Sequence, residues 1–263
     1  MSTEPAEVNQ SDESRMTIWE HLAELRSRLI KSFAAIAVGT VVGWVLYPYV
    51  LEFLREPWCD LSNAEDCRFL VTDPLETFSV RIRISAYLGV AFAMPVLLWQ
   101  VWRFITPGLY PHEKRYALPF VLSALVLFVF GASLAYMTLN PALEFLIGLG
   151  GDNIEAQYTI TKYTTLVTYM MLAFGIAFEL PVLLVALQLL GVTSPRQLLG
   201  WWRPAIVIIA VMAAVITPSG DPITMMALVV PMFLLYFGAI ALGALATWRR
   251  RRRAASAEAT TGS

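Results

Sequence analysis

Glu179 is the residue whose type and position most strongly suggest chemistry. It is the only charged side chain between residues 163 and 195, and about 20 apolar residues are enough to cross a bilayer core of roughly 30 Å. A carboxylate at that depth costs roughly 2.5–3.5 kcal/mol or more. We therefore expect Glu179 to meet a partner, a cavity or a ligand within the membrane. The alternative is a structural role, with Glu179 protonated or bonded to a neighbouring helix. Pro181 removes a helical hydrogen bond, so the helix is expected to bend beside the carboxylate.

Two further acids, Glu24 and Glu113, lie in basic surroundings near the ends of apolar stretches. Both have simple structural explanations. Glu24 can pair with Arg28 one helical turn later, and Glu113 follows Pro111 in the first turn of a predicted helix, where a negative charge complements the helix dipole. The alternative is that both carboxylates bind a cationic ligand. Arginine would suit best, because a guanidinium group pairs with a carboxylate through two hydrogen bonds.

The sequence shows no set of residues that would support catalysis or metal binding. The two histidines, His21 and His112, each have one carboxylate nearby, whereas a zinc site needs three or four converging ligands. We find no nucleophile motif, glycine-rich phosphate loop or HExxH motif, and Glu179 alone does not form a catalytic pair. We therefore expect a protein that is not an enzyme and that has no metal and no cofactor. The net charge of −1 gives no indication of nucleic-acid binding, and we expect none.

The elements that must position these acids are predicted to be transmembrane helices. The chain of 263 residues is 57% hydrophobic and 15% charged, against about 45–50% apolar and about 25% charged in soluble domains. We predict an all-α polytopic membrane protein with a six-helix transmembrane domain at residues 17–248, between a disordered acidic tail at 1–16 and a basic tail at 249–263. The expected spans are residues 32–51, 84–102, 116–143, 163–195, 204–217 and 223–248. An amphipathic surface helix precedes the first span, which is expected to end at Tyr47-Pro48, and residues 52–83 are expected to form a loop.

The distribution of basic residues predicts the orientation. Most of the 19 lysines and arginines fall in the segments that share a side with the N-terminus. Cytoplasmic loops are enriched in Lys and Arg, so we expect both termini to be cytoplasmic. Cys59 and Cys67 then fall in the first outer loop, where a disulfide is permitted. Spacing alone does not establish that they are bonded.

The chain contains the segments EHLAELRSRL at residues 20–29 and QVWRFITPGLYPHEK at residues 100–114. They resemble two motifs of the TatC family, the multispanning subunit of the twin-arginine protein translocase, the first being the family's N-terminal EHLxELRxRL. FGIAFELP at 174–181 resembles the fourth-span signature, and ITP at 216–218 resembles the end of the fifth span. The resemblance covers residues 18–247 in order.

The resemblance implies that the protein recognises folded export substrates through a signal peptide with paired arginines. Glu24 and Glu113 would meet these arginines, and Arg26 and Phe104 would belong to the same surface. Glu179 would lie in a concave intramembrane wall, near the apolar segment of the signal peptide or a partner's span.

The resemblance also assigns two outer positions. Pro57 matches the family's outer-loop proline, and Asp221 approximates the acid after the fifth span. The family usually has Thr-Pro-Pro-Asp at that point, whereas this chain has Thr-Pro-Ser-Gly-Asp, one residue longer. The role of Asp221 therefore stays open.

By resemblance, the partners would be signal peptides, single-span TatA/TatB-type subunits, membrane lipids and further copies of the chain. Assembly would use the proton gradient across the cytoplasmic membrane of a prokaryote. The alternative function is a secondary transporter of a small solute or proton with Glu179 as the relay. No inverted repeats or broken helix pairs are visible in the sequence, which argues against that alternative.

Overall fold

Helices make up almost all of the structure. The computed structural model describes residues 18–62, 69–105, 117–149, 159–217 and 220–261. The helices are α1 (Ile18–Ser62), α2 (Glu76–Ile105), α3 (Ala117–Met137), α4 (Leu139–Gly148), α5 (Ile160–Ala177), α6 (Glu179–Leu189), α7 (Pro195–Gly200), α8 (Trp202–Ile216) and α9 (Pro222–Thr261). The predicted all-α fold is confirmed. The acidic tail at 1–16 lies outside the described residues.

Five stretches of the described chain are long and apolar enough to cross a membrane. They are Leu22–Asp60, Glu76–Phe104, Ala117–Gly148, Ile160–Leu189 and Pro222–Trp248. The shorter apolar helix α8 has 15 residues and rises about 22 Å, less than a bilayer core of about 30 Å. The structure thus shows a polytopic membrane protein with five full-length candidate spans and one short one.

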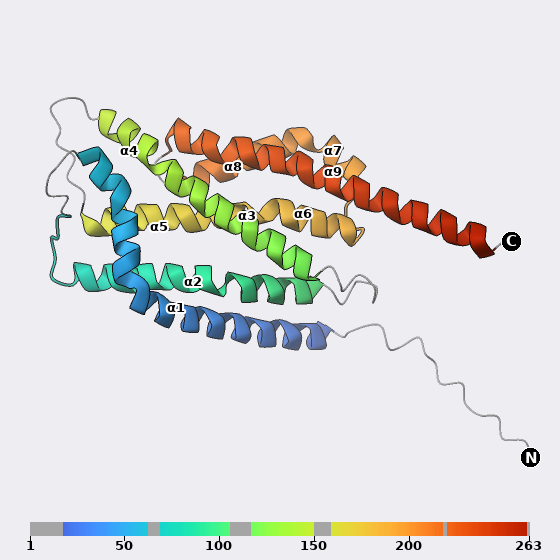
Figure 1. The fold of residues 1–263 in the computed structure, drawn as a ribbon, viewed down its shortest axis with the longest axis horizontal. Coiled ribbons are helices and arrows are strands. Elements are labelled where there is room, and N and C mark those ends of the chain that lie inside the picture. The colour runs from blue at the N-terminus through green and yellow to red at the C-terminus, as the bar shows by residue number, and fades with distance from the viewer. Residues whose placement is uncertain (1–17, 63–68, 106–116, 150–158, 218–219, 262–263) are drawn as a thin grey trace, which may run out of the picture.

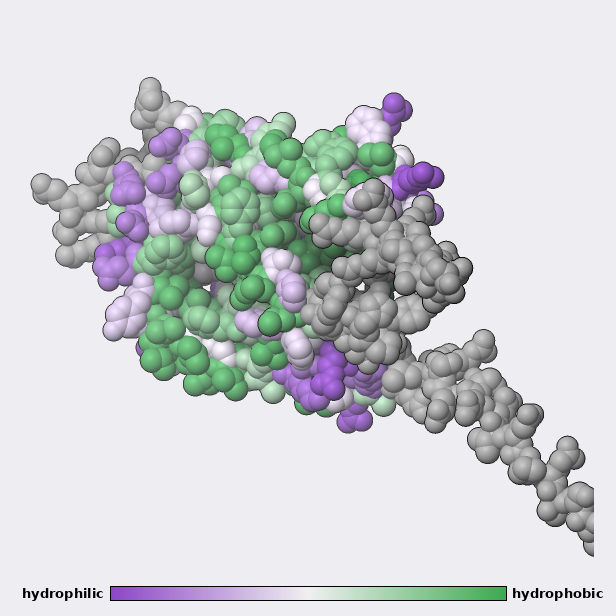
Figure 2. All heavy atoms as spheres, turned by 45° about the vertical axis from the view of Figure 1, so that its right-hand side comes forward, coloured by the Kyte–Doolittle hydropathy of each residue, from purple (hydrophilic) through white to green (hydrophobic). Residues whose placement is uncertain are grey.

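The outside of the helix bundle is strongly apolar. Val38, Val41 and Val45 in α1 are each at least 67% exposed, and Figure 2 shows hydrophobic side chains across the middle of the face drawn, with hydrophilic side chains towards its ends. A surface in contact with water rarely carries so large an apolar area. This is the surface expected of a protein surrounded by lipid.

The start of α1 and the end of α9 lie at the same end of the bundle (Figure 1). The end of α2 and the start of α3 lie there too (Figure 1), and the rings of Trp102 and Phe120 join them with centroids 4.4 Å apart. The N-terminal part of α1 packs along α2 at very short range. A Cβ atom on Gly39 would lie 2.6 Å from the backbone oxygen of Gly89, and small residues permit such close approach of helices in membranes.

Helix α1 differs from the prediction. The first span was expected to end at Tyr47-Pro48 and to lead into a loop at 52–83, but α1 continues to Ser62 with Pro48 and Pro57 inside it. Both expectations were wrong. The helix turns sharply along its length (Figure 1), and we call residues 49–62 the α1 arm.

The two prolines in α1 explain both the turn and its stability. A proline has no N–H, so it leaves the carbonyl group four residues earlier without its helical donor. The carbonyl freed by Pro48 belongs to Trp44, and Arg81 of α2 donates to it at 3.1 Å. The carbonyl freed by Pro57 belongs to Phe53, and the hydroxyl of Tyr136 in α3 donates to it at 3.0 Å. Side chains of other helices therefore satisfy the groups that the prolines expose, as membrane helices require.

Two of the predicted spans are interrupted. The third divides into α3 and α4 at Thr138, and the fourth divides into α5 and α6 at Phe178. A proline follows each break, Pro141 in the first case and Pro181 in the second. The helix is interrupted beside Glu179, where the proline was expected to weaken it, and the bend itself stays a prediction. The expectation of spans without breaks was wrong.

Candidate functional site

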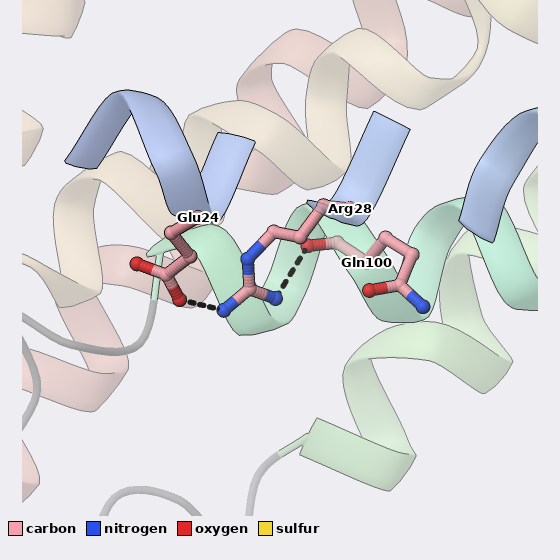
Figure 3. Close-up of polar contacts among 3 residues, drawn as sticks. All are labelled: Glu24, Arg28 and Gln100. Carbon is pink, nitrogen blue, oxygen red and sulfur yellow. Dashed lines mark hydrogen bonds and ion pairs between the residues drawn. The ribbon is translucent and has the colours of Figure 1, made fainter. Parts of the chain in front are cut away.

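Glu24 forms an ion pair with Arg28 on the next turn of α1. The contact joins Nη2 of Arg28 to Oε1 of Glu24 (Figure 3). Both side chains are largely covered, with exposed fractions of 11% for Arg28 and 23% for Glu24. The predicted pairing of Glu24 with Arg28 is therefore confirmed, and the Glu24 carboxylate already binds a guanidinium group.

Arg28 also reaches across to the end of α2. Its Nη1 donates to the backbone oxygen of Gln100 at 3.4 Å (Figure 3). Phe104 lies one turn beyond Gln100 on the same helix and is half-buried. We call the group of Glu24, Arg28, Gln100 and Phe104 the α1–α2 corner. Two residues that the sequence linked only by resemblance, Glu24 and Phe104, thus lie on neighbouring helix ends.

The other two predicted members of this surface, Arg26 and Glu113, are not shown in contact with the α1–α2 corner. Arg26 is exposed and is two residues from Glu24, a spacing at which helix side chains do not face each other. Glu113 lies outside the described residues. The helix ends on either side of it, the end of α2 and the start of α3, are in contact through Trp102 and Phe120.

Glu179 is the first residue of α6, at the break in the fourth span. Its Oε1 atom is buried and has no hydrogen-bond partner among the described residues. A buried polar atom without a partner is costly, because nothing replaces the water it has lost. Glu179 thus holds an unused acceptor inside the membrane region.

Asp221 is a helix cap. Its side chain is almost fully buried, and Oδ1 accepts from the backbone N–H of Thr224 at 2.7 Å. The hydroxyl of Thr224 donates to Oδ2 of the same carboxylate. This is the usual arrangement of an aspartate before the first turn of a helix, here α9. Gly220 precedes it with φ of 59°, so the longer turn still places the acid at the helix start.

The remaining outer positions lie in the α1 arm. Pro57 is buried within the helix rather than in a loop, which corrects the expectation. Cys59 is disulfide-bonded, and its expected partner Cys67 lies outside the described residues. The pairing of these two cysteines stays a prediction.

Sequence reasoning missed Glu76, which connects the start of α2 to the start of α5. Its Oε2 accepts from the backbone N–H of Thr72 at 2.7 Å, and its Oε1 accepts from the backbone N–H of Thr161 in α5 at 3.3 Å. An isolated parallel bridge joins Leu70 to Thr159 beside it. The signal available in the sequence was the segment TDPLE, a turn followed by an acid at a helix start.

No group of three or more potential metal ligands occurs in the part of the chain that the structure describes. The arrangement combines an apolar bundle, a guanidinium–carboxylate pair at one end and, at mid-span, the Oε1 of Glu179, which has no partner among the described residues. These features define a polytopic membrane protein suited to binding or transport.

Comparison with known proteins identifies the family. The family model described as "Sec-independent protein translocase protein (TatC)" matches residues 20–231. The TatC protein of Frankia casuarinae is 41% identical over 254 residues, which cover 93% of this chain and 69% of that protein. The TatC protein of Aquifex aeolicus is 40% identical over 239 residues, covering 90% of this chain and 98% of that protein.

Two solved crystal structures are also similar to this chain in fold and in sequence. A crystal structure of the twin arginine translocase receptor TatC superimposes on this chain with a TM-score of 0.73 and is 40% identical to it in sequence. The match covers 87% of this chain and 100% of that chain. A second, of the same receptor in the detergent DDM, has a TM-score of 0.74 and covers 85% of this chain.

The chain belongs to the TatC family of Sec-independent protein translocase proteins. It is a subunit of the twin-arginine translocase for protein export, and it is a transporter rather than an enzyme. The predicted family and function are confirmed, and the alternative of a secondary transporter for a small solute is not supported.

Proposed function

We propose that the α1–α2 corner, together with Glu113, binds the paired arginines of a signal peptide. The observation that carries this proposal is the ion pair of Glu24 with Arg28, in which a largely covered carboxylate already accepts a guanidinium group. Carboxylates in such surroundings bind arginine strongly, because the charge-assisted hydrogen bonds are less exposed to water. Arg26 and Phe104 complete the surface in this proposal.

Equilibrium binding tests the proposal. The full chain in lipid nanodiscs is titrated with a fluorescent signal peptide that carries two arginines. Glu24→Gln is expected to weaken binding about tenfold or more, because a hydrogen bond between charged groups contributes about 1.5–3 kcal/mol. The matched control is Glu52→Gln, which removes another α1 acid whose side chain is 78% exposed. Equal affinity of wild type and Glu24→Gln would refute the proposal.

The proposed orientation places the α1–α2 corner in the cytoplasm, with α8 as the sixth span and both termini on that side. Arg26 and Lys31 lie in the first third of α1, and Arg103 lies two residues before the end of α2. These two helix ends lie at the same end of the bundle (Figure 1). A concentration of basic residues marks the cytoplasmic side of a membrane protein. The proposed location is the cytoplasmic membrane of a prokaryote.

The residue types at the start of α8 support placing that end of the helix at the membrane boundary. Trp201 directly precedes α8 and is 67% exposed, and Trp202, the first residue of α8, is 40% exposed. The guanidinium group of Arg203 lies 5.4 Å from the ring centre of Trp202. Tryptophan and arginine are typical of the boundary between lipid headgroups and hydrocarbon. The short α8 would then thin the bilayer locally.

Glu179 has a second proposed role, in contact with the apolar segment of the signal peptide or the span of a TatA/TatB-type subunit. The support is its buried Oε1 without a partner in the described chain. A polar group on an incoming helix would satisfy that oxygen. Assembly of these subunits and of further copies of this chain, driven by the proton gradient, belongs to the same proposal.

A further inference from the structure

Arg28 connects two helices through one guanidinium group. Nη2 contacts the carboxylate of Glu24 in α1, and Nη1 donates to the backbone oxygen of Gln100 in α2. A guanidinium group is planar, so two acceptors held in this way fix its orientation. The orientation of the Glu24 carboxylate is therefore tied to the end of α2.

Helix α1 contains a second ion pair, between Arg55 and Glu52, that is exposed and serves as a comparison for the pair of Arg28 and Glu24. Arg55 and Glu52 approach to 3.6 Å, with side chains that are 43% and 78% exposed. Exposed pairs of this kind are weak and change partners readily. The pair of Arg28 and Glu24 is covered and has a third group, the Gln100 carbonyl, that holds it in place.

Fixing the carboxylate matters more for an arginine ligand than for a lysine ligand. Arginine uses two parallel hydrogen bonds, which require the carboxylate plane to be aligned, whereas the ammonium group of lysine is a point charge that tolerates many orientations. Pre-orienting a binding group improves affinity by lowering the entropy lost on binding.

We propose that Arg28 is a positioning residue, which holds the Glu24 carboxylate against α2 and thereby gives the site its preference for arginine over lysine. The inference rests on the proposed function, since it assumes that Glu24 meets the arginines of the signal peptide. The opposite possibility, that Arg28 competes with the peptide for Glu24, makes the opposite prediction.

The experiment compares two peptides on the full chain in lipid nanodiscs. One signal peptide carries Arg-Arg and the other carries Lys-Lys at the same positions. Arg28→Gln is expected to weaken binding of the Arg-Arg peptide about tenfold, which corresponds to about 1.4 kcal/mol, and binding of the Lys-Lys peptide much less. The ratio of the two affinities therefore falls. Arg55→Gln is the control and is expected to leave both affinities unchanged.

Arg28→Lys provides a second measurement that does not depend on the folding of Arg28→Gln. It keeps the positive charge but cannot contact the carboxylate and the Gln100 carbonyl through one planar group, so the preference for Arg-Arg is again expected to fall. Unchanged or tighter binding of the Arg-Arg peptide would overturn the inference. Equal weakening of both peptides would also overturn it, because that result indicates a structural role alone.

The two proposals fail in different ways. If Glu24→Gln weakens binding but the Arg28 variants keep the wild-type preference, only the positioning role is wrong. If Glu24→Gln has no effect, the proposed function itself is wrong. If the wild type does not distinguish the two peptides, there is no preference for Arg28 to set, and the positioning role is wrong.

Discussion

The hydroxyl of Tyr136 donates a hydrogen bond of 3.0 Å to the backbone oxygen of Phe53. That oxygen has no donor within its own helix, because the residue four positions later is Pro57. A side chain also replaces a missing backbone donor at the first proline of α1, where Arg81 donates to the Trp44 oxygen that Pro48 leaves without a helical donor. The α1 arm is thus held by side chains that replace missing backbone donors.

A double mutant tests this explanation of the α1 arm. Tyr136→Phe is expected to lower the free energy of unfolding by about 1 kcal/mol, the usual contribution of one hydrogen bond. In a Pro57→Ala background the loss should be much smaller, because the alanine supplies the backbone N–H that proline lacks. Thermal unfolding in lipid nanodiscs measures both, with Tyr169→Phe as the control, since no hydrogen bond of its hydroxyl is found among the described residues. Equal losses in the two backgrounds would contradict the explanation.

The close approach of α1 and α2 predicts a second effect on stability. A Cβ atom on Gly89 would lie 2.8 Å from the backbone nitrogen of Thr40 and 2.9 Å from the backbone oxygen of Ile36. Gly89→Ala is therefore expected to lower stability by about 1–3 kcal/mol, as overpacking does. Gly238→Ala in α9 is the matched control, because nothing lies within 4 Å of a Cβ atom there. Similar melting temperatures for the two variants would show that the α1–α2 contact is looser than described.

The capping role of Asp221 predicts a graded response. Asp221→Ala is expected to cost about 0.5–2 kcal/mol of stability, because the backbone N–H of Thr224 loses its acceptor. Asp221→Asn keeps an oxygen in the same place and should cost less. Thermal unfolding of the two variants measures this order, and a loss in Asp221→Asn as large as in Asp221→Ala would assign the carboxylate a role beyond capping.

Glu179 is expected to act as a polar contact rather than through a fixed charge. Glu179→Gln keeps an acceptor oxygen and should retain most export, whereas Glu179→Lys places a positive charge within the membrane and should abolish it. Export of a reporter protein with a twin-arginine signal peptide measures both. If both variants lose export equally, ionisation of Glu179 is essential and the contact model is wrong.

The sequence predicted the features that depend on local pattern. The apolar stretches, the pairing of Glu24 with Arg28 and the interruption of the helix beside Glu179 all follow from residues close together in the chain. Family motifs then supplied the function, because the residues around Glu24 and Glu179 match them without gaps.

The features that sequence reasoning missed depend on residues far apart in the chain. Pro48 and Pro57 normally end helices, and only the distant side chains of Arg81 and Tyr136 allow α1 to continue through them. The contact of Arg28 with Gln100 joins residues 72 positions apart. No local pattern contains these contacts, so neither the α1 arm nor the contact between Arg28 and α2 could be predicted.

The central claim is that the α1–α2 corner receives the paired arginines of a signal peptide, while Glu179 faces the apolar segment that follows. Site-specific photocrosslinking to a bound signal peptide tests it most directly, with the crosslinker placed in turn at positions 24, 113 and 179, and at position 52 as a control. The account predicts crosslinks from 24 and 113 to the arginine region and from 179 to the apolar segment, with little from 52. Crosslinks from position 52 as strong as those from position 24 would contradict it.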